Sequence, residues 1–147
     1  MPSTPKTDLV YFLRILEAIG KINTYTSGYE DPYVFFEAND QKDFNASLLL
    51  LMHIGEQVSR ISEPLRNAYT QIPWTAIKGF RNIIAHDYVN VDRFIVFDTI
   101  RQQLPDLQLL IEHIIRTEMA HGTFDKTDYD LSKESTYYRH IDFEKIA

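Results

Sequence analysis

Apolar residues recur at steps of three and four along most of the chain, and this spacing is typical of amphipathic helices. The first series begins after Thr7 or Asp8, both good N-cap residues, and fades at the polar segment TSGYEDP. Its apolar members are Leu9, Phe12, Leu13, Leu16, Ile19 and Ile22. The pattern predicts a first long helix, followed by a short helical turn in the segment YVFFEA.

A second series fills the segment DFNASLLLLMHIGEQVSRIS. One side of the helix that it predicts carries Phe44, Leu48, Leu51, Gly55, Val58 and Ile61. Leu49, Leu50 and Ile54 widen this apolar stripe, so we expect this helix to be the most buried one of the fold.

Two further helices complete the pattern. The third opens at Pro73, a residue favoured in first helical turns, and we expect its Trp74, Ile77 and Phe80 to be core residues. The last follows Asp92, and the cyclic side chain of Pro105 should kink it. Its apolar positions are Phe97, Ile100, Leu104, Leu107, Ile111 and Ile114. No alternating pattern of useful length competes, so the predicted fold class is an all-α, up-and-down helical bundle.

The length of 147 residues suits one domain with a real core. We place the helical domain at residues 1–122, because the periodicity breaks at Gly122. Residues 123–147 mix charges with tyrosine and phenylalanine. Two interpretations are open for them: a loosely ordered C-terminal tail, or an arm that docks its aromatic side chains on a partner or sister subunit.

The net charge of −6 argues against a broadly basic surface that coats nucleic acid, although it permits a small local phosphate site. The absence of cysteine excludes disulfides and thiolate metal sites. The N-terminus MPSTPKTD lacks the apolar core of a secretion signal, and the apolar run SLLLLM is far too short to span a bilayer. We therefore expect a cytoplasmic protein without a membrane partner.

Candidate chemistry concentrates in the segment GFRNIIAHDYVN. Arg81 supplies a planar, permanently charged fork suited to phosphate, and His86 can exchange a proton near neutral pH. Together they could cleave RNA without a metal, because His86 would take the proton of a 2′-hydroxyl, which DNA lacks. Asn82 could hold the phosphate or orient His86, Asp87 could fix the histidine tautomer, and Tyr88 brings a hydroxyl to the same region.

Helical geometry constrains this hypothesis. Arg81 and His86, five residues apart, point about 140° apart on an ideal helix. Either the helix ends near His86 and turns it round, or the two side chains meet across two chains. We interpret Ile83, Ile84 and Ala85 as the buried back of this helix. The structural alternative is that His86 and Tyr88 only cap a helix end, while Arg81 pairs with Glu56 of the neighbouring helix.

A metal or cofactor site is not expected. His53 and Glu56 are three residues apart, as in the metal-binding pairs of helical bundles. Such di-metal sites need a second pair and further carboxylates, and the sequence does not offer them. The chain has no glycine-rich phosphate loop and no serine-nucleophile elbow either.

Arg81, His86 and Tyr88 fit the R-x4-H-x-Y motif of HEPN-domain proteins, and in particular the chain resembles the HepT toxins of prokaryotic HepT–MntA toxin–antitoxin pairs. The segment HIGEQVSRIS resembles the family's Gly-Glu helix, and IPWTAIKGFRNIIAHDY resembles its W…RN…HDY segment. VNVD with LPDLQLLIEHII resembles the closing helix. The resemblance extends roughly from Thr7 to Thr117.

The resemblance implies a homodimer in which the Arg and His motifs of both chains line one cleft. It implies the toxin of a type VII-like toxin–antitoxin system, a metal-independent endoribonuclease with Arg81 and His86 as catalytic residues. Asn82 and Asp87 would support them. The implied partner is a minimal nucleotidyltransferase antitoxin, similar to MntA, that adds AMP to Tyr88. The implied substrate is RNA, such as tRNA or mRNA.

Two other functions remain open. The chain could be a non-catalytic subunit of a nucleotidyltransferase complex, in which Arg81 and His86 bind a nucleotide or the partner. It could also be a purely structural helical dimer. The acidic net charge bears on this choice, since a ribonuclease of this composition needs a narrow, locally basic cleft.

Overall fold

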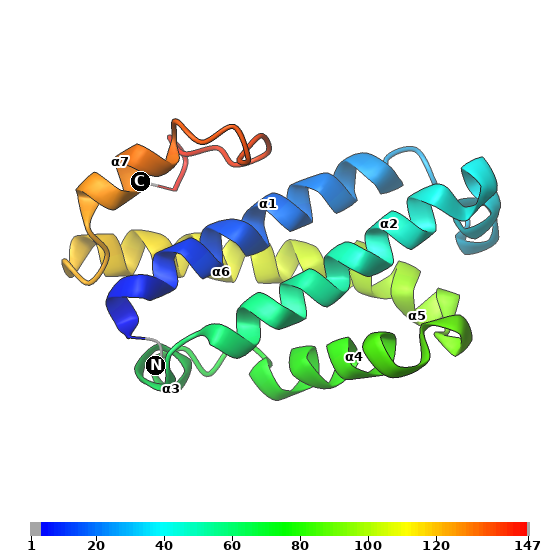
Figure 1. The fold of residues 1–147 in the computed structure, drawn as a ribbon, viewed down its shortest axis with the longest axis horizontal. Coiled ribbons are helices and arrows are strands. Elements are labelled where there is room, and N and C mark those ends of the chain that lie inside the picture. Colours follow the sequence, from blue (N-terminus) through cyan, green and yellow to red (C-terminus); the bar gives the residue numbers. More distant parts are fainter. Residues whose placement is uncertain (1–3, 147) are drawn as a thin grey trace.

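The computed structural model describes residues 4–146, and within that range the chain is helical and contains no strand (Figure 1). Helix α1 (Asp8–Thr26) lies antiparallel to α2 (Pro32–Arg60), and α6 (Leu104–Ala120) runs behind α1. Helix α4 (Trp74–Asp87) packs along the other side of α2. The prediction of an all-α, up-and-down bundle is confirmed.

Shorter elements connect these helices. They are η1 (Pro5–Thr7), α3 (Glu63–Ala68), η2 (Tyr88–Asn90), α5 (Arg93–Asp98), the π-helical turn η3 (Thr99–Gln103) and α7 (Lys126–Ser132). The first three residues and the last lie outside the described range, so the expectation for a signal sequence falls partly outside it. Within residues 4–146, no helix combines the length and the apolar character that crossing a bilayer requires.

The core lies where α1 meets α2 and α6. All six apolar residues predicted for the first helix are buried, as are the six on the main stripe of the second. The prediction that the second helix is the most buried is wrong, because Leu49 is 62% exposed and α1 holds more buried residues than α2. Helix α1 is enclosed between α2 and α6, whereas the outer side of α2 is not covered by another helix.

A sharp kink divides α2 into a short and a long segment. Asp31 caps the short segment, accepting hydrogen bonds from the backbone N–H groups of Tyr33 (2.7 Å) and Val34 (3.4 Å). Residues 39–41 then have left-handed backbone angles, with φ between 52° and 64°, although none of them is glycine. The predicted short helical turn in YVFFEA is therefore confirmed as the first part of α2.

The closing helix is interrupted just before Pro105 by a π-helical turn, whereas the predicted kink stays a prediction. Helix α5 widens into the π-helical turn η3 before α6 begins at Leu104. Pro105 has no N–H to donate to the carbonyl four residues earlier, so the regular hydrogen-bond ladder is interrupted in this turn. Asp92 caps the start of α5, accepting from Phe94 N at 2.8 Å and Ile95 N at 3.3 Å.

The chain after Gly122 packs back onto its own bundle, across the side opposite α4 (Figure 1). Phe124, Tyr129 and Ile146 are buried. The buried carboxylate of Glu17 on α1 accepts hydrogen bonds from the backbone N–H groups of Arg139 (2.6 Å) and His140 (2.8 Å). These contacts contrast with the loosely ordered tail that the charge pattern suggested, because the segment contributes to the core.

A contact with Gly20 brings the segment close to α1. A Cβ atom at Gly20 would lie 2.2 Å from the Cβ of His140, so only glycine allows this approach. Lys145 adds an ion pair with the buried Glu112 of α6, at 3.4 Å. The docking of an arm on a partner stays a prediction, but it cannot use Phe124 or Tyr129 while they are buried in their own chain.

Replacing Tyr129 should reveal how much this segment stabilises the fold. We expect Tyr129→Ala to lower the free energy of unfolding by about 3–5 kcal/mol, because it empties a fully buried aromatic site. The matched control, Tyr137→Ala, removes a ring of the same segment that is 43% exposed, and it should cost clearly less, about 1 kcal/mol. Urea unfolding measures both. Equal, small effects would mean that the segment does not belong to the core.

Candidate active site

Helix α4 presents the motif residues, and it is covered on one side only. Ile84 is its buried residue, whereas Ile83 is 58% exposed and Ala85 is also exposed. The interpretation of all three as a buried back is therefore wrong. Successive residues of a helix point 100° apart, so three in a row cannot all face one neighbouring helix.

Arg81 lies against α2 at a point where that helix has no side chain. A Cβ atom at Gly55 would lie 2.3 Å from the Cβ of Arg81, so the close approach of α4 to α2 requires glycine there. The guanidinium forms an ion pair with Glu56, the next residue of α2, and both side chains are about one-third exposed. The structural alternative for Arg81, a pair with Glu56, is thus present in the structure.

The contacts of Arg81 do not use all of its donors. Its Nη1 donates to the side-chain oxygen of Asn82 at 3.0 Å, and its Nη2 contacts Glu56. The buried Nε has no hydrogen-bond partner among residues 4–146. A guanidinium carries five N–H donors, so this group can bind an anion without first losing every protein contact.

His86 does not converge with Arg81 inside one chain. Helix α4 continues through Asp87, so His86 is still helical and lies about 140° round the helix from Arg81. Arg81 faces α2, whereas His86 is exposed. The sequence allowed two geometries. In the first, the helix ends near His86 and turns its side chain towards Arg81, and the structure does not have this geometry. The meeting of Arg81 and His86 across two chains stays a prediction.

The remaining motif residues have distinct surroundings. Asp87 accepts a hydrogen bond from the side-chain amide of Asn90 at 2.9 Å, which ties the end of α4 to η2. Tyr88 begins η2 and is 59% exposed, so its ring is accessible. Asn82 is exposed and contacts Arg81. Only Arg81 and Asn82 are brought into contact by the fold of one chain.

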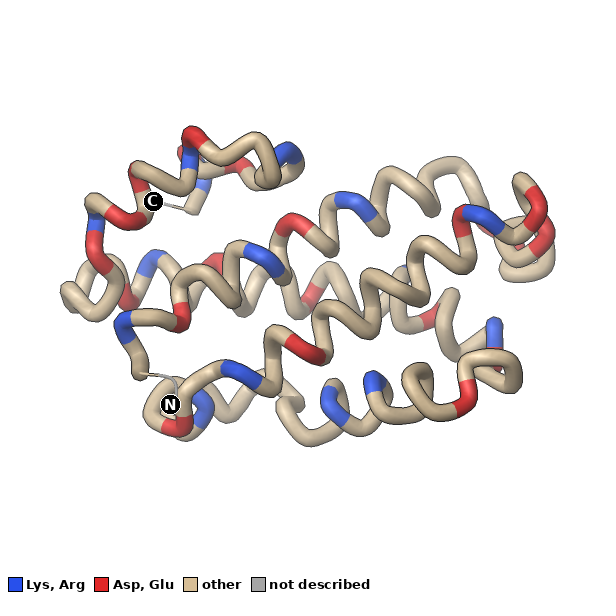
Figure 2. The backbone as a smooth tube through the Cα atoms, viewed as in Figure 1, with Lys and Arg blue, Asp and Glu red and all other residues tan. Residues whose placement is uncertain are grey.

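The charge on α4 differs from that of the whole chain. Two basic bands precede one acidic band at its end (Figure 2), and the sequence identifies them as Lys78, Arg81 and Asp87. Helix α4 alone carries two basic side chains against one acidic side chain, but Glu56 of α2, which pairs with Arg81, offsets this excess of positive charge. This charge distribution suits one phosphate group better than an extended nucleic-acid backbone.

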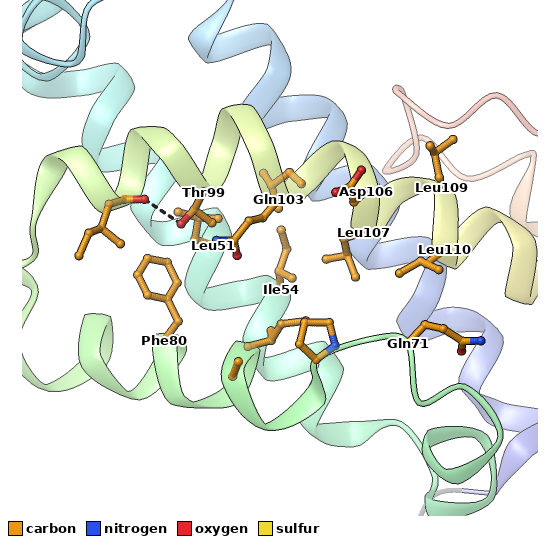
Figure 3. A pocket seen from close by; sticks show the side chains of 15 residues that line it. Leu51, Ile54, Gln71, Phe80, Thr99, Gln103, Asp106, Leu107, Leu109 and Leu110 are labelled. Atoms are coloured by element: carbon orange, nitrogen blue, oxygen red, sulfur yellow. Dashed lines mark hydrogen bonds between the residues drawn. The ribbon is translucent and has the colours of Figure 1, made fainter.

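An apolar groove of about 790 Å³ separates α4 from α6 and runs beside the motif (Figure 3). Phe80 enters it from α4, Leu51 and Ile54 from α2, and Leu107 and Leu110 from α6. The expectation that Trp74, Ile77 and Phe80 are core residues is confirmed in part. All three pack against the core but are only partly buried.

His53 and Glu56 have surroundings that do not favour a metal. Glu56 is engaged by Arg81. The pKa of His53 is lowered, first by burial and then by the positive charges of Arg14, Lys21 and Arg60. Such a cationic environment repels a metal ion as it does a proton. Among the described residues, no cluster of three or more His, Asp or Glu side chains is arranged to hold a metal.

Gly55 is the site residue whose role the sequence did not reveal. It was expected only as one member of an apolar stripe, yet it sets the distance between α2 and α4. The available signal was a glycine inside a long helix, directly before a glutamate. Glycine destabilises a helix interior, so its presence there indicates a close packing contact.

Comparison with known proteins identifies the family. The family described as Ribonuclease HepT-like matches residues 15–114, which include α4 and its motif. The chain belongs to the HepT-like ribonuclease family. No solved structure matches it.

Three of the curated relatives resemble this HepT-like chain over most of their own length. “Putative RNase MJ1216” of Methanocaldococcus jannaschii is 33% identical over 76% of this chain and 91% of its own length. “Putative RNase MJ0125” of the same organism is 31% identical over 76% of this chain and 95% of its own length. “Probable ribonuclease HepT” of Thermococcus cleftensis is 28% identical over 67% of this chain and 86% of its own length.

Two glycines of the bundle test the contact that positions Arg81. We expect Gly55→Ala to destabilise the protein by about 1–3 kcal/mol, because the new methyl group overlaps Arg81. Gly79→Ala is the matched control on α4, since a Cβ there meets no described atom within 4 Å. It should stabilise by roughly 0.5–1 kcal/mol through helix propensity. The midpoint temperature of thermal unfolding measures both effects. If it shifted in the same direction for both variants, the close contact of Arg81 with Gly55 would be contradicted.

Proposed function

We propose that the chain is a metal-independent endoribonuclease and the toxin of a toxin–antitoxin pair. The observation that carries the proposal is the family match over α4, which bears Arg81 and His86, and over the start of η2, which bears Tyr88. The relatives named as ribonucleases support the reaction class. The substrate class is RNA, and a structured RNA such as tRNA or an mRNA fits a site with so little surrounding positive charge.

The proposed chemistry assigns one step to each catalytic residue. His86 takes the proton of a ribose 2′-hydroxyl, and the 2′-oxygen attacks the neighbouring phosphorus. Arg81 stabilises the charge that develops on the phosphate oxygens. The bond to the 5′-oxygen breaks, and this oxygen leaves with a proton from an acid or from water. Asn82 and Asp87 support the pair, Asn82 through its contact with the Arg81 guanidinium.

A homodimer supplies the geometry that one chain lacks. The arginine of one copy and the histidine of the other would form each site, which removes the conflict of about 140° within a single helix. The apolar groove beside α4, with the exposed Ile83, Ile95 and Leu109 near or on its edges, is the surface that a second copy would cover.

Tyr88 is the proposed regulatory site. Its hydroxyl belongs to a largely exposed side chain two residues after His86, so a partner enzyme can reach it. AMP on this oxygen adds a bulky group and a negative charge where the RNA phosphate must lie. The proposed partner is a minimal nucleotidyltransferase antitoxin, similar to MntA.

The alternative, a non-catalytic subunit that binds a nucleotide or a nucleotidyltransferase, is favoured by one observation. Arg81 is already paired with Glu56, whose negative charge competes with an incoming phosphate. The acidic net charge points in the same direction. Such a subunit would bind nucleotide or partner without cleaving RNA.

Substitution of the two catalytic residues separates these functions. We expect Arg81→Ala to lower the rate of RNA cleavage by about 10²–10³, the usual cost of losing one charge-stabilising donor. His86→Ala should lower it by about 10²–10⁴ through loss of the base. Cleavage of a tRNA pool in the presence of EDTA measures both. Arg116→Ala, which removes an exposed arginine of α6, is the control. Parental activity in both motif variants would refute the catalytic assignment.

Mixing the two inactive variants tests whether the site is shared between chains. A heterodimer of Arg81→Ala and His86→Ala retains one pair made of an intact arginine and an intact histidine. Co-expression should therefore restore part of the activity. If arginine and histidine of the same chain acted together, every site of the heterodimer would lack one of them and the mixture would stay inactive.

Intact mass tests the proposed switch at Tyr88. Co-expression with a cognate minimal nucleotidyltransferase should raise the mass of the chain by whole AMP units and abolish cleavage. Tyr88→Phe should show no such increase, because it lacks the acceptor oxygen. Tyr33→Phe, which removes the hydroxyl of another exposed tyrosine, is the matched control and should still be modified. An unchanged mass of the parent would count against the switch.

A further inference from the structure

A second pocket, which the proposed chemistry does not use, adjoins Tyr88. We call it the kink pocket, because it lies between the kink of α2 and the start of α5. Its volume is about 590 Å³. Tyr88 forms part of its wall, and the residues used in the argument below are Phe36, Gln41, Asn45, Arg93 and Phe94.

One wall of the kink pocket is a stack of rings around a guanidinium. The Cζ atom of Arg93 lies 4.7 Å from the ring centroid of Phe36 and 4.7 Å from that of Tyr33. The ring of Phe94 meets Tyr33 edge to face at 5.0 Å. Tyr33 lies outside the lining of the pocket and supports Arg93 and Phe94 from behind, whereas Phe94 lines the pocket and is exposed, so it presents ring surface to solvent. Aromatic rings and arginine planes are the groups on which unpaired bases stack.

The lining of the kink pocket also includes hydrogen-bonding side chains that have no partner within the described part of the chain. Gln41 and Asn45 line the pocket, and none of the side-chain hydrogen bonds within residues 4–146 involves either amide. The left-handed angles of Asn39, Asp40 and Gln41 turn the chain here, at a cost of roughly 1–2 kcal/mol per residue. A carboxamide can both donate to and accept from the edge of a base.

The charges around the kink pocket favour a base rather than a phosphate. The carboxylate of Asp92 lines it and already accepts the two backbone N–H groups at the start of α5. These two donors are therefore not available to an anion, and the Asp92 side chain places a carboxylate at this end of the helix. Arg93 is held between the rings of Tyr33 and Phe36, so its positive charge is already shared with two aromatic rings and is less available to a phosphate.

We infer that the kink pocket is a nucleobase-binding subsite of the same active site, an inference that rests on the proposed function for the source of the base. The base stacks on the wall formed by Arg93, Phe36 and Phe94, and the amides of Gln41 and Asn45 contact its edge. Two sources can supply it. One is the RNA nucleotide next to the phosphate handled by His86, and the other is the adenine of AMP attached to Tyr88.

Binding of adenosine, 5′-AMP and inorganic phosphate to the full chain tests the subsite directly. Titration calorimetry should detect adenosine and AMP but not phosphate alone. Arg93→Ala and Asn45→Ala should each weaken adenosine binding about tenfold, since one base stack contributes about 1–3 kcal/mol. Asn45 is exposed, so its replacement leaves the fold intact even if Arg93→Ala disturbs the rings.

Arg101→Ala is the matched control, because Arg101 also stacks on a ring, 5.0 Å from the centroid of Phe97, but does not line the kink pocket. It should bind adenosine like the parent. Absence of adenosine binding, equal binding by phosphate alone, or unchanged binding in both pocket variants would overturn the subsite.

Two further measurements separate the sources of the base and the two proposals. If AMP on Tyr88 places its adenine in the pocket, the modified chain no longer binds free adenosine; if it still binds, the pocket serves RNA.

With RNA as substrate, Arg93→Ala should raise KM and leave kcat near the parental value, whereas Arg81→Ala lowers kcat. Adenosine binding by a chain that cleaves no RNA would refute the ribonuclease and keep the subsite. RNA cleavage by a chain that does not bind adenosine would refute the subsite and keep the ribonuclease.

Discussion

The close packing of α4 on α2 at Gly55 is the constraint on which the arrangement of the motif depends. Because Gly55 has no side chain, the aliphatic part of Arg81 lies directly on α2 and its guanidinium reaches Glu56. This contact fixes the rotation of α4 about its own axis. Once Arg81 faces α2, helical geometry sends His86 and Ile83 outward, so one contact orients the whole motif.

The ion pair of Arg81 with Glu56 positions the arginine more than it stabilises the fold. Both side chains are about one-third exposed, and pairs of this kind contribute only about 0–1 kcal/mol to stability. A weak pair can be exchanged for a contact with phosphate at little cost in folding free energy. The guanidinium is thus held in a defined place and remains available to a ligand, which a deeply buried pair would prevent.

The helices could be predicted because each carries a periodic apolar stripe, but the stripe does not reveal whether a neighbour covers it. Ile77 and Phe80 continue the stripe of α4, yet they face an open groove, and Leu49 faces solvent. The types of the motif residues, with the family resemblance, indicated a site at Arg81 and His86. Their orientation depended on Gly55 and on where α4 ends, and neither is visible in residue spacing.

The C-terminal segment links distant parts of the chain, since the backbone of Arg139 bonds to Glu17, 122 positions earlier. During synthesis from the N-terminus, the face of α1 around Glu17 has no cover until that segment has left the ribosome. Contacts of such long sequence separation also form late in folding. The bundle therefore acquires its complete core only after residues 123–146 have been synthesised, and until then the newly made chain lacks part of its final packing.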